Sequence, residues 1–213
     1  LAPAGTLRIS APTSFGACVM APLIATFLQQ WPDVRVEPDL TNRLVDLVAE
    51  GVDCVLRLGE LEDSALISRR IGEIAFVTCA SPAYLARHVP PQRVQDLALH
   101  NCLTYTYFGK SLWEFLGPDG PESVPVSGNL SANISNLLLA ATLDGAGISL
   151  QPAYSVQAHL ESGALVPLLT QWQPKQLGVY AVYGTRKQMS PLLRSFLDFL
   201  IARMADDPLW QAR

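Results

Sequence analysis

Two hydroxyl side chains follow directly on the first apolar run of the sequence. In GTLRISAPTSFG (residues 5–16), the run from Leu7 to Ala11 predicts a strand, and Thr13 and Ser14 lie in the turn before a helix. In open α/β sheets, ligands bind beyond the carboxyl end of a strand, where N–H groups at the start of a helix face them. Thr13 and Ser14 either add hydroxyl donors to such a site or only cap the helix.

A cation, Arg57, lies near the end of the nearly continuous apolar run from Val52 to Leu58. Such a run is typical of a strand buried on both faces, where a charged side chain is costly unless it is paired or solvated. Arg57 could clamp the carboxylate of a ligand through two parallel hydrogen bonds. The alternative is an ion pair with Glu60, Asp53 or another acid.

Three further polar or aromatic residues lie near the ends of predicted elements in the second half of the chain. Tyr105 and Tyr107 share one face of an alternating segment, and they either wall a pocket or pack against helices. Asn133 lies near the start of a helix expected over about 133–144, where it either donates to a ligand or serves as the N-cap. Arg57 and the hydroxyls favour an anionic ligand, and the tyrosines favour an aromatic or otherwise apolar one.

Residues that would support catalysis or metal binding lack the required spacing. No G-x-S-x-G motif occurs, no His, Cys, Asp or Glu set has metal-ligand spacing, and the three histidines fall at predicted helix ends or loops. Gly145-Ala146-Gly147 leads into a strand, whereas a dinucleotide fingerprint opens a helix. We therefore expect that the protein is not an enzyme and that it has no catalytic residue, no metal site and no cofactor.

The four cysteines lack C-x-x-C spacing, which predicts packed, reduced thiols of a cytoplasmic protein. Cys18 differs from the others because it lies near the head of the first helix, where the pKa of a thiol can be lowered. A redox sensor would need two of these cysteines brought together.

Composition limits the classes of partner. The chain has 213 residues and a net charge of −4, and its basic residues are scattered, so this segment is not expected to grip DNA by itself. No run of eighteen apolar residues predicts a membrane span, and no secretory leader is visible. The sequence starts with Leu1, which indicates a fragment or a processed product.

The order of elements predicts two α/β lobes with a cleft between them. The N-terminal part is read as β-α-β-α-β, with a second helix capped by Asn42 and ended by Gly51, which predicts a parallel sheet. A last strand and helix return the chain to the first lobe, so that two strands near 77–80 and 173–178 join the lobes. The remaining predicted strands and helices cover residues 17–30, 34–40, 74–80, 81–87, 103–107, 113–116, 124–126, 148–150, 152–160, 179–183 and 190–200.

Over nearly its full length the sequence resembles the effector-binding domain of LysR-type transcriptional regulators. The resembling blocks are GTLRISAPTSFG (5–16), LVDLVAEGVDCVLRLGEL (44–61), DSALISRRIGEIAFVTCASPAYL (63–85), LLLAATLDGAGISLQP (137–152), ESGALVPLL (161–169) and VYAVYGTRKQMSPLLRSFLDFL (179–200). The resemblance implies two Rossmann-like lobes of the type 2 periplasmic-binding-protein architecture: lobe I over 1–77 and 178–213, and lobe II over 78–177. It also implies an N-terminal DNA-binding domain that is absent from this sequence.

The resemblance further implies a small-molecule effector, an organic acid or an aromatic compound, in the cleft between the lobes. It implies a homodimer or tetramer, formed through the first helix, the strand near 34–40 and the helix near 153–162. The resemblance also implies that DNA is contacted only through the absent domain, that no membrane is involved and that the location is cytoplasmic. Carried over by position, the effector-binding residues are Pro12, Thr13, Ser14, Phe15, Arg57, Leu58, Tyr105, Tyr107, Asn133, Gln151 and Pro152.

Two other functions fit a two-lobed α/β chain. A periplasmic solute-binding protein of a transporter shares the architecture but carries a leader peptide upstream instead of a helix-turn-helix. An enzyme on the same scaffold requires an acid, base or nucleophile with a shifted pKa facing the cleft.

Overall fold

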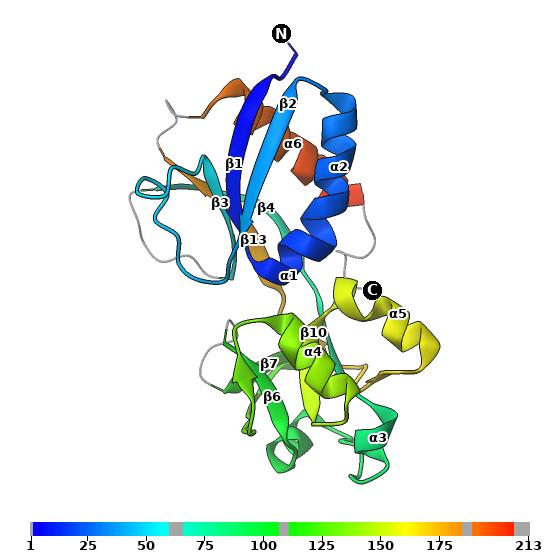
Figure 1. The fold of residues 1–213 in the computed structure, drawn as a ribbon. Coiled ribbons are helices and arrows are strands. Elements are labelled where there is room, and N and C mark those ends of the chain that lie inside the picture. Colours follow the sequence, from blue (N-terminus) through cyan, green and yellow to red (C-terminus); the bar gives the residue numbers. More distant parts are fainter. Residues whose placement is uncertain (1, 60–65, 107–110, 185–188, 207–213) are drawn as a thin grey trace. The chain divides into compact units, whose positions relative to one another are not determined.

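The computed structural model describes residues 2–59, 66–106, 111–184 and 189–206, and Figure 1 labels its helices and strands. The chain divides into two units. Unit 1 comprises Leu1–Glu73 and Leu177–Arg213, and unit 2 comprises Ile74–Gln176. The chain therefore leaves unit 1 once and returns once, and its C-terminal segment completes the first unit.

Unit 1 is built on a five-stranded sheet. Its strand order is β2 (Val34–Leu40), β1 (Gly5–Ala11), β3 (Cys54–Leu58), β13 (Leu177–Tyr183) and β4 (Ile67–Ile74). Strands β2 and β3 run parallel to β1, whereas β13 runs antiparallel to β3. The carboxyl ends of β1 and β3 consequently lie at one edge of the sheet, and the carboxyl end of β13 lies at the other.

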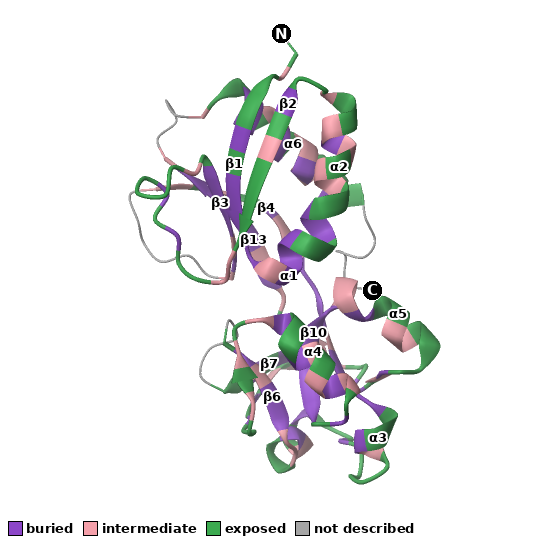
Figure 2. Ribbon diagram, viewed as in Figure 1, coloured by how far each residue is buried: buried purple, intermediate pink, exposed green. Residues whose placement is uncertain are grey.

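The helices of unit 1 come from both ends of its sequence. A continuous helical stretch contains α1 (Thr13–Phe15), the π-helical turn η1 (Gly16–Met20) and α2 (Ala21–Gln30). The C-terminal helix is α6 (Pro191–Asp206). Phe27 of α2 packs edge-on against Phe196 of α6, with ring centroids 5.2 Å apart. Phe27 and Phe196 have no exposed surface, in agreement with the apolar spacing of both helices. Figure 2 colours the helices and strands by burial.

The described residues of unit 2 form two sheets. The larger has the order β11 (Val166–Pro167), β5 (Phe76–Ala80), β10 (Ile148–Pro152), β6 (Cys102–Tyr105) and β9 (Ser131–Ala132). The smaller consists of β12 (Gln173–Pro174), β7 (Leu112–Gly117) and β8 (Gly120–Pro125). The helices are α3 (Pro82–Leu85), the 3₁₀ segment η2 (Val94–Leu99), α4 (Ser135–Leu143) and α5 (Ala153–Ser162). Every residue of β10 is buried, which makes this strand the centre of the unit.

Most of the predicted elements are confirmed, with shifted ends. The first helix starts earlier than predicted, at Thr13, and includes a π-helical turn. At Gly16 this turn packs closely against the Leu40 side chain at the end of β2, which a Cβ at this position would meet. Strand β4 was not predicted: its sequence ISRRIGEI carries two adjacent arginines and lacks a clear alternation.

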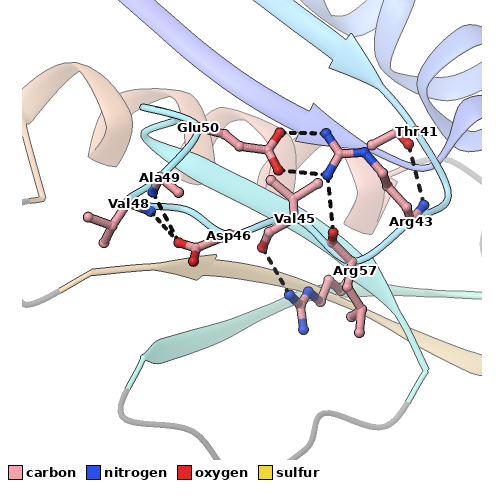
Figure 3. Close-up of polar contacts among 9 residues, drawn as sticks. Thr41, Arg43, Val45, Asp46, Val48, Ala49, Glu50 and Arg57 are labelled. Carbon is pink, nitrogen blue, oxygen red and sulfur yellow. Dashed lines mark hydrogen bonds and ion pairs between the residues drawn. The ribbon is translucent and has the colours of Figure 1, made fainter.

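The predicted helix between Asn42 and Gly51 is wrong. The segment forms turns instead, in which Asp46 Oδ1 accepts hydrogen bonds from the N–H groups of Val48 and Ala49, each at 3.1 Å. Arg43 closes the segment with two hydrogen bonds to Glu50, both 2.6 Å long (Figure 3). In this segment Asp46 competes for the backbone donors that a helix would use internally, as Asp side chains do in turns.

No helix in the described part of the chain is both long and apolar enough to cross a membrane.

Candidate functional site

In unit 1, the turn after β1 starts the helix without a side-chain cap. The N-cap position is Pro12, and Thr13 and Ser14 already lie inside the helix, so the interpretation of these two residues as caps is wrong. The Thr13 N–H donates instead to Oδ1 of Asn42, at 3.0 Å. The Thr13 hydroxyl has no hydrogen-bond partner among the described residues and is half-buried, which leaves it able to bind a ligand.

The other turn residues that the sequence assigned to the site are buried. Pro12 is buried, and Ser14 and Phe15 expose 6% and 1% of their surface. Ser14 and Phe15 both have further interactions inside the protein. Thr13 is therefore the most accessible residue of this turn.

Arg57 lies at the same edge of the sheet as Thr13, because β1 and β3 are parallel. Its side chain is half-buried, and its Nη2 lies 3.5 Å from the carbonyl oxygen of Val45 (Figure 3). Among the described residues Arg57 forms no ion pair with Asp53, whose carboxylate accepts a hydrogen bond of 2.8 Å from the Arg8 N–H. Glu60, the other proposed partner, lies outside the described residues. Arg57 thus has a single weak contact within the described structure.

A tyrosine that the sequence did not single out lies beside Arg57. The antiparallel register of β3 and β13 pairs Arg57 with Tyr180, so both side chains point to the same face of the sheet. The Tyr180 ring lies over Gly178, where a Cβ would collide with it. Leu58, the next residue of β3, is buried. Only the pairing of strands far apart in the sequence reveals Tyr180, which explains why it was missed.

In unit 2, Tyr105 packs in a buried cluster with Leu103 and Leu138. Tyr107 lies outside the described residues. Asn133 is exposed between β9 and α4, and it is not the N-cap of α4, because Ile134 holds that position. The interpretation of Asn133 as a helix cap is therefore wrong, and its side chain is available to a ligand.

A directed chain of hydrogen bonds fixes Gln151 of β10. Thr142 Oγ1 donates to the Leu138 carbonyl oxygen at 2.6 Å, so the hydrogen between Thr142 and Ser149, whose hydroxyl oxygens are 2.7 Å apart, belongs to Ser149. Ser149 Oγ must then accept from Gln151 Nε2, at 3.1 Å. This order sets the amide orientation of Gln151.

In this orientation Gln151 Oε1 is an acceptor without a partner in the described structure, and water cannot reach it because the residue has no exposed surface. The next residue, Pro152, is also buried and forms the N-cap of α5. Ser155 Oγ donates to the Pro152 carbonyl oxygen at 2.9 Å. The Gln151–Pro152 turn is thus rigidly held from both sides.

The cysteines do not form a reactive pair. Burial raises the pKa of the Cys18 thiol, which corrects the expectation that the helix start could lower it. Burial raises the pKa of Cys54, Cys79 and Cys102 to about 12. All four are free thiols, and in the described part of the chain no three His, Cys, Asp or Glu side chains gather as metal ligands.

A polar cluster that the sequence analysis missed joins α3 to the segment after η2. Tyr84 Oη lies 2.7 Å from His100 Nδ1, and the Tyr84 ring stacks on His88 with centroids 4.2 Å apart. Burial lowers the pKa of His100, and the charge of His88 lowers it further. Spacing alone did not reveal the cluster, because its members are brought together by tertiary packing.

The sequence and the fold both match proteins of one kind. The family model for the LysR substrate binding domain matches residues 2–205. The chain is 35% identical over 203 residues to the HTH-type transcriptional regulator DmlR of Escherichia coli (strain K12), covering 93% of this chain and 65% of that protein. It is 33% identical to the HTH-type transcriptional regulator CrgA of Neisseria meningitidis serogroup C, covering 96% of this chain and 69% of that protein.

Solved structures of two such regulators match as well. The CrgA regulatory domain of N. meningitidis superposes with a TM-score of 0.80 at 33% identity, covering 94% of this chain and 99% of that one. Full-length AphB of Vibrio cholerae superposes with a TM-score of 0.79 at 30% identity, covering 94% of this chain and 69% of that one. These matches favour a regulator over a transporter's solute-binding protein.

Proposed function

This chain belongs to the LysR substrate binding domain family of transcriptional regulators, with the two-lobed α/β fold of the periplasmic-binding-protein type, and we propose that it binds a small organic acid as its effector. Each unit by itself has residues that are proposed to bind the effector. Unit 1 contributes the Pro12–Phe15 turn with the Thr13 hydroxyl, together with Arg57 and Leu58. Unit 2 contributes Tyr105, Tyr107, Asn133 and the Gln151–Pro152 turn.

The observation that carries this proposal is the environment of Arg57. A half-buried guanidinium at the carboxyl end of a buried strand has only a carbonyl oxygen at 3.5 Å as its described partner. A carboxylate would supply the missing charge and two parallel acceptors. Tyr180 pairs with Arg57 across the sheet and would pack against the apolar part of the same ligand.

The chain spans 65% of the length of DmlR. For the whole regulator we propose an attached DNA-binding domain, a homodimer or tetramer, and action in the cytoplasm, where bacterial DNA lies. Effector binding changes the DNA contacts only if the effector has different affinities for two states of the protein. The edge strand β2 and helix α2, on which Leu23, Ile24 and Leu28 remain partly exposed, are proposed to form the dimer contact together with α5.

A thermal-shift screen of small organic acids tests the effector proposal. An acid present at one hundred times its dissociation constant adds about 2.7 kcal/mol to the free energy of unfolding, which raises the melting temperature. Arg57→Met should abolish that rise, and the Thr13→Ala/Ser14→Ala double variant should reduce it. Arg93→Gln is the matched control, because it removes an exposed positive charge from unit 2. An acid that stabilises the wild type and Arg57→Met equally would show that the effector is bound elsewhere.

A further inference from the structure

Unit 1 contains a cavity of about 340 Å³ at the sheet edge where β13 ends. Because β13 is antiparallel to β3, this edge is the one where β1 and β3 begin. Thr13 and Arg57 lie at the opposite edge. Strand β1 has seven residues and spans about 20 Å, so a metabolite in the cavity cannot also contact the proposed effector site.

The cavity is lined by Arg69 of β4, Tyr183 at the end of β13, Met189, and Arg194 and Asp198 of α6. Tyr183 exposes only 6% of its surface, and it lines the cavity. No other described residue accepts a hydrogen bond from its hydroxyl, which is therefore able to donate to an acceptor in the cavity.

The charges around the cavity have a positive excess. Arg69 is paired with Asp198, with Nη2 and Oδ1 2.8 Å apart, which holds the Arg69 guanidinium in place. Arg194 also lines the cavity, and within the described structure no carboxylate pairs with its exposed guanidinium. Arg194 lies in the first turns of α6, whose N-terminal partial charge is also positive.

From this arrangement we propose that the cavity is a second binding site of the chain, specific for a small carboxylic acid with an apolar body. Arg194 and the Tyr183 hydroxyl donate hydrogen bonds to the carboxylate, Arg69 adds positive charge, and Met189 contacts the apolar part. The volume is at the lower end of the range of about 300–1,000 Å³ for small-molecule pockets, which suits a compact metabolite. The proposal does not depend on the effector site at the other edge.

Methionine-methyl NMR tests the proposal directly. The chain has three methionines, and the other two, Met20 and Met204, are almost fully buried away from the cavity lining, so ¹³C-methyl labelling gives Met189 as the local reporter. The probe is 3-fluorophenylacetate, titrated into wild type and into Arg57→Met, in which the proposed effector site is removed. We expect a saturable shift of the Met189 methyl signal in both proteins.

Variants of the lining separate specific binding from a surface effect. Arg194→Gln should weaken binding about tenfold or more, since a hydrogen bond to a charged group is lost, and Tyr183→Phe should weaken it about fivefold. Arg203→Gln, which removes an exposed cation from the same helix, should leave the affinity within about twofold. The proposal is overturned if no saturable shift occurs up to about 10 mM probe, if the neutral amide 3-fluorophenylacetamide binds equally well, or if Arg57→Met abolishes the Met189 shift while Arg194→Gln does not.

Discussion

The hydrogen-bond chain through Gln151, Ser149 and Thr142 predicts that two neighbouring substitutions differ strongly in their effect on stability. Ser149→Ala removes the hydroxyl that accepts from Gln151 and donates to Thr142. The buried Gln151 amide then has a donor without a partner, and Ser149 itself has no exposed surface through which water could replace it. Burying such an unpaired group costs about 1–3 kcal/mol, so we expect the free energy of unfolding to fall by about 2 kcal/mol.

Gln151→Met should cost much less, although it removes the larger polar group. The substitution loses one neutral hydrogen bond, worth about 1 kcal/mol, but it also removes Oε1, an acceptor that is buried without a described partner. The two contributions oppose each other, and methionine fills a similar volume with a flexible side chain. The expected change is therefore less than about 1 kcal/mol in either direction.

Urea unfolding at 25 °C, followed by tryptophan fluorescence, measures both effects. Trp113 is buried in unit 2, the same unit that contains the hydrogen bonds of Gln151, Ser149 and Thr142, and its fluorescence reports on the unfolding of that unit. Ser123→Ala, at an exposed position of β8, is the matched control for loss of a hydroxyl and should change the free energy of unfolding by less than about 0.5 kcal/mol. A larger loss for Gln151→Met than for Ser149→Ala would refute the reasoning, because it would mean that Oε1 has a partner in the folded protein.

Three further outcomes are expected. Asn42→Ala should lower the free energy of unfolding by about 1 kcal/mol, because the Thr13 N–H loses its acceptor. Asn42→Asp keeps an oxygen acceptor and should retain most of the wild-type stability, and urea unfolding measures both variants. Gly145→Ala should lower the melting temperature by an amount equivalent to about 1 kcal/mol or more, since Gly145 has a φ of +85°, and a normal melting curve would contradict this. Alkylation of Cys18 by iodoacetamide should require higher pH than alkylation of free cysteine, because burial raises the pKa of this thiol; a profile shifted to lower pH would mean that the helix start lowers the pKa.

Strands and helices with strong apolar periodicity could be predicted from the sequence. The run from Leu7 to Ala11 and the spacing of Leu193, Phe196, Leu197 and Leu200 are one-dimensional signals. The structure buries the apolar residues of both segments and leaves Arg8 exposed. A serine directly before a proline is also a recognisable start signal for a helix, and Ser81 indeed caps α3, where its Oγ accepts a hydrogen bond of 3.3 Å from the Tyr84 N–H.

In the segment 42–51, apolar periodicity predicted the wrong structure. Leu44, Val45, Leu47 and Val48 have helical spacing, but only Val45 and Leu47 are buried, while Leu44 and Val48 expose 75% and 86% of their surface. The pairing of Arg43 with Glu50 and the acceptor of Asp46 set this conformation. Tertiary and side-chain contacts of this kind override a weak periodic pattern.

For the candidate site, too, local sequence signals predicted some residues, and residues that depend on tertiary contacts were missed. Thr13 and Arg57 were predicted because each follows or ends a strand, and parallel strands bring both to one edge. Tyr180 was not predicted, since it becomes a neighbour of Arg57 only when β13 pairs with β3. The orientation of Gln151 depends on hydroxyl groups of α4 and β10 together, which no local pattern encodes.

Strand β13 connects the two proposed sites of unit 1. Tyr180 pairs with Arg57 near one edge of the sheet, and Tyr183, on the same strand, lines the cavity at the other. If the cavity and effector site favour different states of the protein, binding at one changes the affinity at the other by the same factor, because linkage is reciprocal. Titrating the effector with and without 3-fluorophenylacetate, and the probe with and without effector, must give equal ratios. Ratios of one in both directions would mean that the two sites are independent and that the rigid core of β13 does not transmit either binding event.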